Sequence, residues 1–229
     1  MPLLRLRMLT MLSPVTSSWN EMLTQRLQLF VALQELVAEY MLHPLQEQPP
    51  LDDSLEQLHF YISFHGLNDL PMQRLVARAY RAVIRDVNVA YAAAQSSSEQ
   101  DSLQHQYLHN LLPVPGRRRR VGFISKFLGI FEPHGLLLEG VLMHLPRSSY
   151  VIVCLPVARP DGKPLSPLFR IICDEVVEVS LVYEYSLQQV NSLNLDVLVF
   201  ADSLGEPVNH FMLHNRIAPL QVIPFERQL

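Results

Sequence analysis

Short apolar runs without polar alternation dominate the second half of the chain, and a helix-like stretch separates each run from the next. The clearest runs are YVIVCL at 150–155 and DVLVFA at 196–201, both rich in β-branched residues. A strand that is apolar on both faces has to be covered on both, and helices between successive strands provide that cover. The pattern therefore predicts an α/β fold built on a parallel, Rossmann-like sheet with right-handed crossovers.

The same pattern gives approximate bounds for the elements of this region, which we take as one domain over 117–229. Pro207 fits the first turn of the last helix, because proline lacks the N–H that a first turn leaves unused. The predicted strands are 121–125, 150–155, 176–180, 196–201 and 220–223, and the predicted helices are 136–145, 168–172, 184–193 and 206–215.

The first 110 residues contain only helix and loop patterns. Apolar residues recur at three- and four-residue steps and predict an amphipathic helix whose apolar face is Trp19, Met22, Leu23, Leu27, Phe30, Leu33, Val37, Tyr40 and Met41. A second helix fits 55–64, and a third follows a cap at Asn68 or Asp69. The apolar face of that third helix is Met72, Leu75, Val76, Ala79, Tyr80, Val83, Ile84, Val87 and Tyr91. We expect 1–110 to be a helical, degenerate repeat-like segment with its linker, and a plain helical cap is the alternative.

Charge, run length and cysteine spacing exclude several classes of protein. The 229 residues carry a formal net charge of -4, which argues against a general nucleic-acid partner. No apolar run reaches the roughly 18 residues of a membrane helix, and the first twenty residues fit an irregular terminus better than a transit peptide. Cys154 and Cys173 lie outside any metal or redox spacing, which predicts two buried, reduced thiols of an intracellular protein, cytoplasmic or nuclear.

Ligands of open parallel sheets bind in the crevice at the carboxyl ends of the strands, and that rule selects three loops here. They are the loop 125–134, the loop that holds Arg159, Asp161 and Lys163, and the loop 201–207. The helix beginning at Glu206 points its N-terminus at this crevice, which favours a polar or anionic ligand group. The candidate ligand-binding residues are Ser125, Lys126, Asp202 and Glu206, and the candidate catalytic residue is His134.

Each candidate also has a purely structural interpretation. His134 could be a helix N-terminal histidine bonded to nearby backbone, and Asp202 could be a loop or cap carboxylate. The arginines of 117–120 are most simply a solvated linker, although a nuclear-localisation or RNA patch has the same composition. His210 and His214 have the spacing of metal ligands without a third ligand nearby. No glycine pattern cradles a phosphate, and no cofactor or metal fingerprint is present.

Three segments resemble protein O-linked N-acetylglucosaminyltransferases and their SPINDLY-like relatives. RVGFISKFLGIFEPHGLLLEGVLMHLPR at 120–147 resembles the first strand, loop and helix of that family's catalytic region. LDVLVFADSLGEPVNHFMLHNRIAPLQVI at 195–223 is similar to a later segment, which ends in an R-x-A-P-x-Q stretch. FYISFHGLNDLPMQRLVARAYRAV at 60–83 is similar to the helix that joins the family's tetratricopeptide repeats to its catalytic part.

The resemblance implies one Rossmann-like half of a GT-B fold, preceded by tetratricopeptide-like helices that present a polypeptide acceptor. It implies transfer of N-acetylglucosamine or fucose from a nucleotide sugar, UDP-N-acetylglucosamine in the first case, to Ser or Thr hydroxyls of proteins. A loop histidine lines the cleft in the family, whereas an ungapped match places Phe131 there and leaves His134 nearest.

The family's second Rossmann half, which holds most donor contacts, has no counterpart here, so we expect a truncated chain that is inactive alone and binds nucleotide weakly. Two other functions stay open. The chain could be a non-catalytic module that binds a polypeptide partner or self-associates through an exposed apolar face. It could also be an independent Rossmann-like nucleotide-binding protein.

Overall fold

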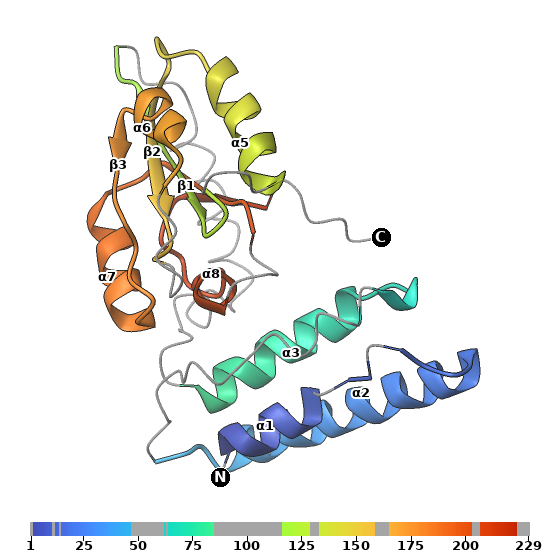
Figure 1. Cartoon of the computed structure of the whole chain (residues 1–229). Coiled ribbons are helices and arrows are strands. Elements are labelled where there is room, and N and C mark those ends of the chain that lie inside the picture. Colours follow the sequence, from blue (N-terminus) through green and yellow to red (C-terminus); the bar gives the residue numbers. More distant parts are fainter. Residues whose placement is uncertain are drawn as a thin grey trace. The chain divides into compact units, whose positions relative to one another are not determined.

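The structure is a computed structural model of the whole chain, and it describes residues 2–10, 12–13, 15–46, 62, 64–84, 116–128, 133–158, 165–202 and 207–223. The chain forms two compact units (Figure 1). One comprises Met1–Asn88 with Arg227–Leu229, and the other comprises Val89–Glu226. The predicted helix at 55–64 lies largely outside the described residues.

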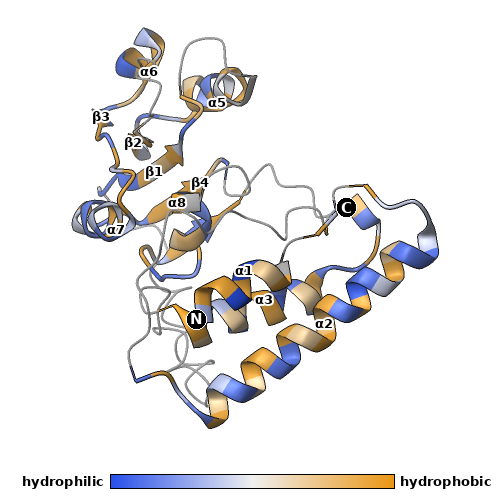
Figure 2. Ribbon diagram, turned by 60° about the horizontal axis from the view of Figure 1, so that its bottom comes forward, coloured by the Kyte–Doolittle hydropathy of each residue, from blue (hydrophilic) through white to orange (hydrophobic). Residues whose placement is uncertain are grey.

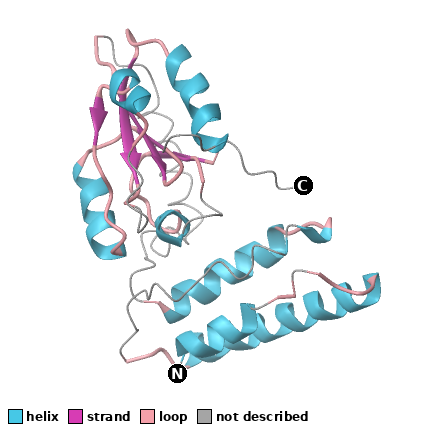
Figure 3. Ribbon diagram, in the orientation of Figure 1, coloured by secondary structure: helices cyan, strands magenta, loops and turns pink. Residues whose placement is uncertain are grey.

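Three described helices build the first unit: α1 (Pro2–Thr10), α2 (Trp19–Leu42) and α3 (Leu70–Val83). They pack side by side, as Figure 3 shows. Ser18 caps α2, because its hydroxyl accepts the backbone N–H of Glu21 at 3.2 Å. The prediction of an irregular terminus is wrong, since residues 2–10 form a helix with Leu6 fully buried.

The predicted apolar face of α3 is confirmed for its members within the helix, which are all buried. The buried face of α2 matches the predicted one only in part. Both apolar and polar residues run along this helix (Figure 2). Trp19, Leu27 and Met41 are 58%, 64% and 66% exposed. Its buried residues are Met22, Leu29, Leu33, Leu36 and Val37.

The two residues before α3 have different roles at the start of this helix. Asp69 occupies the cap position but makes no side-chain cap hydrogen bond. Its carboxylate instead accepts from Arg26 of α2 at 2.6 Å, in an ion pair whose side chains are 12% and 9% exposed. The backbone N–H of Leu70 is satisfied by Oδ1 of Asn68 at 3.1 Å. Asp69 therefore ties α2 to α3.

The second unit is a five-stranded, entirely parallel sheet in the order β3-β2-β1-β4-β5. This confirms the predicted α/β class: a helical segment followed by a Rossmann-like parallel sheet. The strands are β1 (Arg119–Ser125), β2 (Tyr150–Pro156), β3 (Glu175–Val176), β4 (Val197–Phe200) and β5 (Leu220–Val222). The strand predicted at 176–180 is shorter than expected, with a single further bridge between Val157 and Val179.

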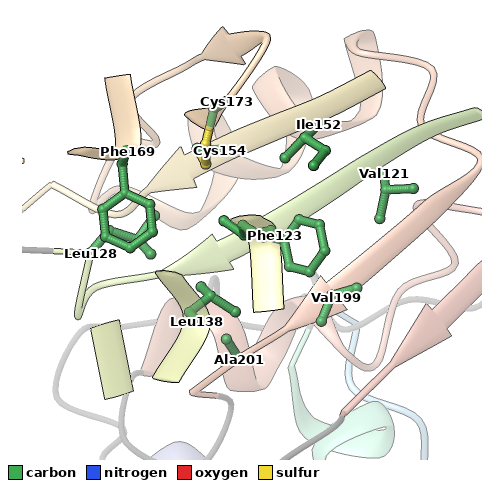
Figure 4. Packing of buried hydrophobic residues seen from close by; sticks show 11 residues of the cluster. Val121, Phe123, Leu128, Leu138, Ile152, Cys154, Phe169, Cys173, Val199 and Ala201 are labelled. Atoms are coloured by element: carbon green, nitrogen blue, oxygen red, sulfur yellow. A yellow bond between two sulfur atoms is a disulfide. The ribbon is translucent and has the colours of Figure 1, made fainter. Parts of the chain in front are cut away.

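In the part of this unit that the structure describes, four helices flank the sheet: α5 (Pro133–His144), α6 (Pro167–Ile172), α7 (Tyr183–Ser192) and α8 (Pro207–Met212). α5 contacts α6, and α7 contacts α8. A buried cluster joins α5 and α6 to the sheet (Figure 4). Its members are Val121, Phe123, Leu128, Leu138, Leu142, Ile152, Cys154, Phe169, Cys173, Val199 and Ala201. These two helices therefore cover one face of the sheet.

A disulfide joins Cys154 of β2 to Cys173, which follows α6, within that cluster. The prediction of two reduced thiols is therefore wrong. The cysteines no longer support a location in a reducing compartment. The two Cα atoms are 5.9 Å apart across 19 residues of sequence. Spacing could not reveal this pair, because only the packing of α6 against β2 brings the sulfur atoms together.

The four arginines are part of the fold rather than a solvated linker. Arg119 and Arg120 belong to β1. Arg120 forms a bidentate pair with Glu175 of β3, at 2.7 and 2.8 Å. Arg117 pairs with Asp196 at 2.7 Å. These interactions fasten the amino-terminal edge of the sheet, opposite to the candidate crevice.

None of the helices that the structure describes is long and apolar enough to cross a membrane.

Candidate functional site

The order in which the chain adds strands to the sheet reverses at β1. From β1 the chain proceeds outward to β2 and β3, then returns across the sheet to β4 and β5 on the other side. In open α/β sheets, such a switch point is where a ligand-binding crevice is expected, outside the carboxyl ends of the two strands, here β1 and β4. Ser125 is the last residue of β1, and Asp202 follows β4 after Ala201. The order of strands thus selects this edge as the candidate site.

Asp202 is the centre of the polar contacts at this edge. Its Oδ2 accepts the backbone N–H of Lys126 at 2.8 Å, and its Oδ1 accepts Nδ2 of Asn209 at 2.7 Å. The side chain of Ser125 also hydrogen-bonds the carboxylate. Ser125 and Asn209 are buried, at 1% and 0% exposed, and Asp202 is 6% exposed. The cluster joins the exits of two strands to helix α8.

The environment of Asp202 changes its acidity. Burial disfavours the charged form and raises the pKa of Asp202 to about 6, against the opposing effects of the hydrogen bonds and of the Lys126 ammonium. A carboxyl group with this pKa changes its charge in mildly acidic solution. Perturbed carboxyl groups in a crevice are typical of functional sites, because few structural roles require a buried charge.

Ser125 stabilises the start of the loop that leaves β1. Its Oγ accepts the backbone N–H of Phe127 at 2.9 Å. The ammonium of Lys126 lies 5.3 Å from the centre of the Phe127 ring. A polar ligand in the crevice would therefore meet one lysine beside a buried carboxylate, on backbone that side-chain hydrogen bonds hold in place.

The structure thus brings together Ser125, Lys126 and Asp202 of the predicted ligand-binding residues. Glu206 lies outside the described residues, as do Phe131 and the loop with Arg159, Asp161 and Lys163. His134 lies in the first turn of α5, which follows the β1 exit. Its catalytic role stays a prediction.

Sequence reasoning missed Asn209. This residue lies in the first turns of α8 and is fully buried, although asparagine is usually exposed. Only the fold shows that Asn209 donates to Asp202.

The two histidines of metal-ligand spacing form a ring contact. His210 and His214 meet edge to face with their centres 5.2 Å apart, and His210 makes a similar contact with Phe211. Among the described residues, no group of three or more His, Cys, Asp or Glu side chains could hold a metal ion.

The helical unit contains a cavity of its own, of about 270 Å³. Its lining is mostly apolar, with the ion-paired Arg26 as its charged member. The lining residues are Leu23, Arg26, Leu27, Phe30, Leu67, Asn68, Pro71 and Met72.

The chain is similar to solved structures, whereas no sequence relative matches it. No model of a protein family matches the chain, and no curated protein matches it. A mutant of the O-GlcNAc transferase of Thermobaculum terrenum is similar to 96% of this chain, at 19% sequence identity and a TM-score of 0.38. The match covers 50% of that protein, so this chain spans about half of its length. Such a loose overlap says nothing about what this chain binds or catalyses.

Proposed function

We propose that the α/β unit forms one wall of a sugar-transfer crevice, of the kind that protein O-linked N-acetylglucosaminyltransferases use. The acceptor would be a Ser or Thr hydroxyl of a polypeptide, and the donor a nucleotide sugar carrying N-acetylglucosamine or, in a SPINDLY-like variant, fucose. The proposal rests on the sequence resemblance and on the way the chain folds those segments together.

The observation that carries the proposal is the hydrogen bond between Lys126 and Asp202. These residues come from two separate segments, 120–147 and 195–223, which both resemble the family. The first segment contains β1 and α5, and the second contains β4, α8 and β5. Since β1 pairs with β4, the segments converge at one edge of the sheet, where parallel α/β folds bind ligands.

The chemistry of this edge suits a hydroxyl-bearing ligand. A buried carboxylate and a hydroxyl at the strand ends can accept and donate hydrogen bonds, and Lys126 adds a positive charge at the lip. Transfer with inversion needs the acceptor hydroxyl held in line with the leaving diphosphate. We assign this wall to the acceptor side, and we expect little turnover and weak nucleotide affinity from the chain alone.

The helical unit would present the polypeptide. Its cavity of about 270 Å³ is lined mainly by apolar side chains of α2 and the start of α3, and it is large enough for one or two side chains of a bound peptide.

The test is a titration of the isotope-labelled full chain with a peptide containing Ser and Thr, followed by amide NMR. A matched peptide has Ala at every hydroxyl position. We expect shifts at Ser125, Lys126 and Asp202 with the hydroxyl peptide alone, and none at the opposite edge near Arg120. Equal shifts with both peptides, or shifts confined to the Arg120 edge, would overturn the proposal. The Lys126→Ala variant should weaken the response.

A companion titration with UDP and UDP-N-acetylglucosamine, with an assay for released UDP, tests the assignment of this wall to the acceptor side. We expect weak heats and no release. Micromolar binding with turnover would show instead that this chain assembles a complete donor site.

A second candidate function is self-association, and the surface of α5 favours it. Four large apolar side chains of this helix are exposed: Leu136 at 58%, Leu137 at 50%, Val141 at 39% and Met143 at 58%. Exposed apolar faces of this kind are typical of interaction sites. Sedimentation at increasing concentration tests this function. A Leu137→Lys variant should remain monomeric where the unmodified chain associates.

A further inference from the structure

Two aspartates bracket β4: one accepts a backbone N–H from within β1, and the other accepts the backbone N–H of the residue that follows β1. Oδ2 of Asp196, before β4, accepts from Arg120 at 2.8 Å, and Oδ2 of Asp202, after β4, accepts from Lys126 at 2.8 Å. The residues of both pairs are 76 apart, which matches the register in which Val121 pairs with Val197. The two carboxylates therefore make equivalent hydrogen bonds at opposite ends of the β1–β4 pair.

Their surroundings differ. The side chain of Asp196 is 19% exposed and pairs with the guanidinium of Arg117 at 2.7 Å. Asp202 is 6% exposed, and its donors are the uncharged groups of Lys126, Asn209 and Ser125. Asp196 therefore has the ordinary arrangement of a structural carboxylate near solvent, whereas burying the charge of Asp202 costs free energy. The carboxylate of Asp202 therefore lies at the carboxyl end of the strand pair at a cost in free energy, whereas that of Asp196 at the amino end does not. This difference points to a functional role for Asp202.

The contacts of Asp202 lead into the loop that leaves β1. Asp202 accepts the N–H of Lys126 directly, and it hydrogen-bonds Ser125, whose Oγ accepts the N–H of Phe127. Two successive backbone amides of the loop are therefore held through one carboxylate. The helix α8 is fastened to the same group through Asn209.

We propose that Asp202 is the positioning residue of the candidate site: its carboxyl group holds the β1 exit in the ligand-binding shape, protonation strengthens this hold, and ionisation weakens it. The inference deepens the proposed function by naming what regulates the crevice, and it rests on that function only for the identity of the ligand. Its test needs no ligand, so the two can fail separately.

The charges around Asp202 support a response in mildly acidic solution. Burial raises the pKa of Asp202 to about 6, and the ammonium of Lys126 is the charge that opposes this effect. From α8 the carboxylate meets the neutral amide of Asn209. The next residue, His210, is a buried histidine that packs its ring against Phe211 and His214. Glu206 lies outside the described residues. A His210→Gln variant removes the ionisable imidazole that follows Asn209 in the sequence.

The experiment is amide hydrogen exchange of the full-length chain by NMR from pH 5 to 7.5, with rates corrected for intrinsic exchange. The variants are Asp202→Ala, Asp202→Asn and, as the register-matched control, Asp196→Asn. We expect Asp202→Ala to lower the protection of the Lys126 and Phe127 amides at least about tenfold at pH 7.5, because bonds to a charged acceptor are lost. The protection of Arg120 should be unchanged. Asp196→Asn should show the reverse pattern.

The pH profile is the readout that a merely structural carboxylate would not change. In the unmodified chain and in His210→Gln, protection of Lys126 and Phe127 should rise as the pH drops through about 6, because opening exposes the carboxyl group of Asp202 to water, where its pKa is lower; protection of Arg120 should show no such rise. Asp202→Asn should show no such step. Asn209→Ala should move the step to higher pH, since a bond that favours the charged form is gone.

Three outcomes would overturn the inference. One is unchanged protection of Lys126 and Phe127 in a folded Asp202→Ala variant. Another is an equal loss at Phe123 and Ile124 within β1, which would indicate general destabilisation. If Asp202→Ala does not fold, the pH profile decides alone, and a flat profile at Lys126 in the unmodified chain rejects the proposal. A negative peptide titration together with a clear pH step would reject the proposed function and leave this inference intact.

Discussion

The side-chain amide of Asn209 donates to Oδ1 of Asp202 at 2.7 Å, and both residues are buried. Burial raises the pKa of Asp202 from 3.8 to about 6, so the folded chain keeps a proton between these pH values that the unfolded chain has released. Folding is therefore favoured in acid relative to neutral solution. The contribution of Asp202 to stability is greatest below pH 3.8 and declines as the pH rises through about 6.

Replacement of Asp202 by Asn should stabilise the chain at neutral pH. Removing the buried charge should raise the free energy of unfolding by about 3 kcal/mol, for a pKa difference of about two units. The weaker hydrogen bonds of a neutral side chain should lower it by roughly 1 kcal/mol. We expect a net gain of about 2 kcal/mol at pH 7.5 and little gain at pH 4.5. The Asn209 amide can turn over to accept from the new amide.

Urea unfolding of both proteins at several pH values measures this gain. Asp196→Asn is the matched control, and it should lose stability at pH 7.5 because it breaks the ion pair with Arg117. A gain from Asp202→Asn that is larger at pH 4.5 than at pH 7.5 would contradict the assigned acidity.

Reduction of the disulfide between Cys154 and Cys173 should destabilise the α/β unit. The bond closes a segment of 19 residues, and the loss of chain entropy in the unfolded state for such a loop is about 3 kcal/mol. We expect dithiothreitol to lower the melting temperature of the unmodified chain. It should have no effect on a Cys154→Ala/Cys173→Ala variant, which should already melt at a lower temperature. Equal melting of both chains without reductant would show that the bond contributes nothing.

Gly122 should not tolerate a methyl group. This residue lies within β1, where an added Cβ would overlap Cδ1 of Leu195 and approach Cδ1 of Leu155 and of Leu198 at 3.2 and 3.3 Å. Gly122→Ala should therefore cost about 1–3 kcal/mol through overpacking. Gly140 on α5 is the matched control, since nothing lies within 4 Å of its added Cβ. Gly140→Ala should stabilise by about 0.5–1 kcal/mol. Thermal unfolding of the pair distinguishes them by the sign of the shift.

The pair between Arg120 and Glu175 should contribute modestly, because it lies near solvent. Its side chains are 29% and 41% exposed, so we expect Glu175→Gln to cost only about 0.5–1 kcal/mol at pH 7. The hydrogen bond from Arg120 lowers the pKa of Glu175. The stabilisation is therefore present above the ordinary glutamate pKa and is lost as the pH falls below it. Glu178→Gln, at an exposed position after β3, should change the unfolding free energy little. Equal effects of the two variants at pH 7 would show that the ion pair between Arg120 and Glu175 does not contribute to stability.

Hydrophobic periodicity predicted the elements well where one face or both faces of an element are buried. The predicted apolar face of α3 is buried from Met72 to Val83, and the strands at 121–125 and 150–155 are those observed within two residues. For α2, periodicity predicted the helix and misjudged part of its buried face, since Leu27 is exposed and Leu36 is buried. A long helix with apolar residues on several sides can bury more than one face, and its neighbours decide which.

The candidate site divides in the same way. The sequence by itself determined that Ser125 and Asp202 follow apolar strands, because runs of β-branched residues end there. Only the tertiary structure decided that these strands are neighbours, through the order β3-β2-β1-β4-β5. Contacts between Lys126, Asn209 and Asp202, and the bond between Cys154 and Cys173, follow from that order and from the packing of the helices. Local pattern fixes which faces are apolar, whereas the pairing of distant segments depends on the free energy of the whole packed fold.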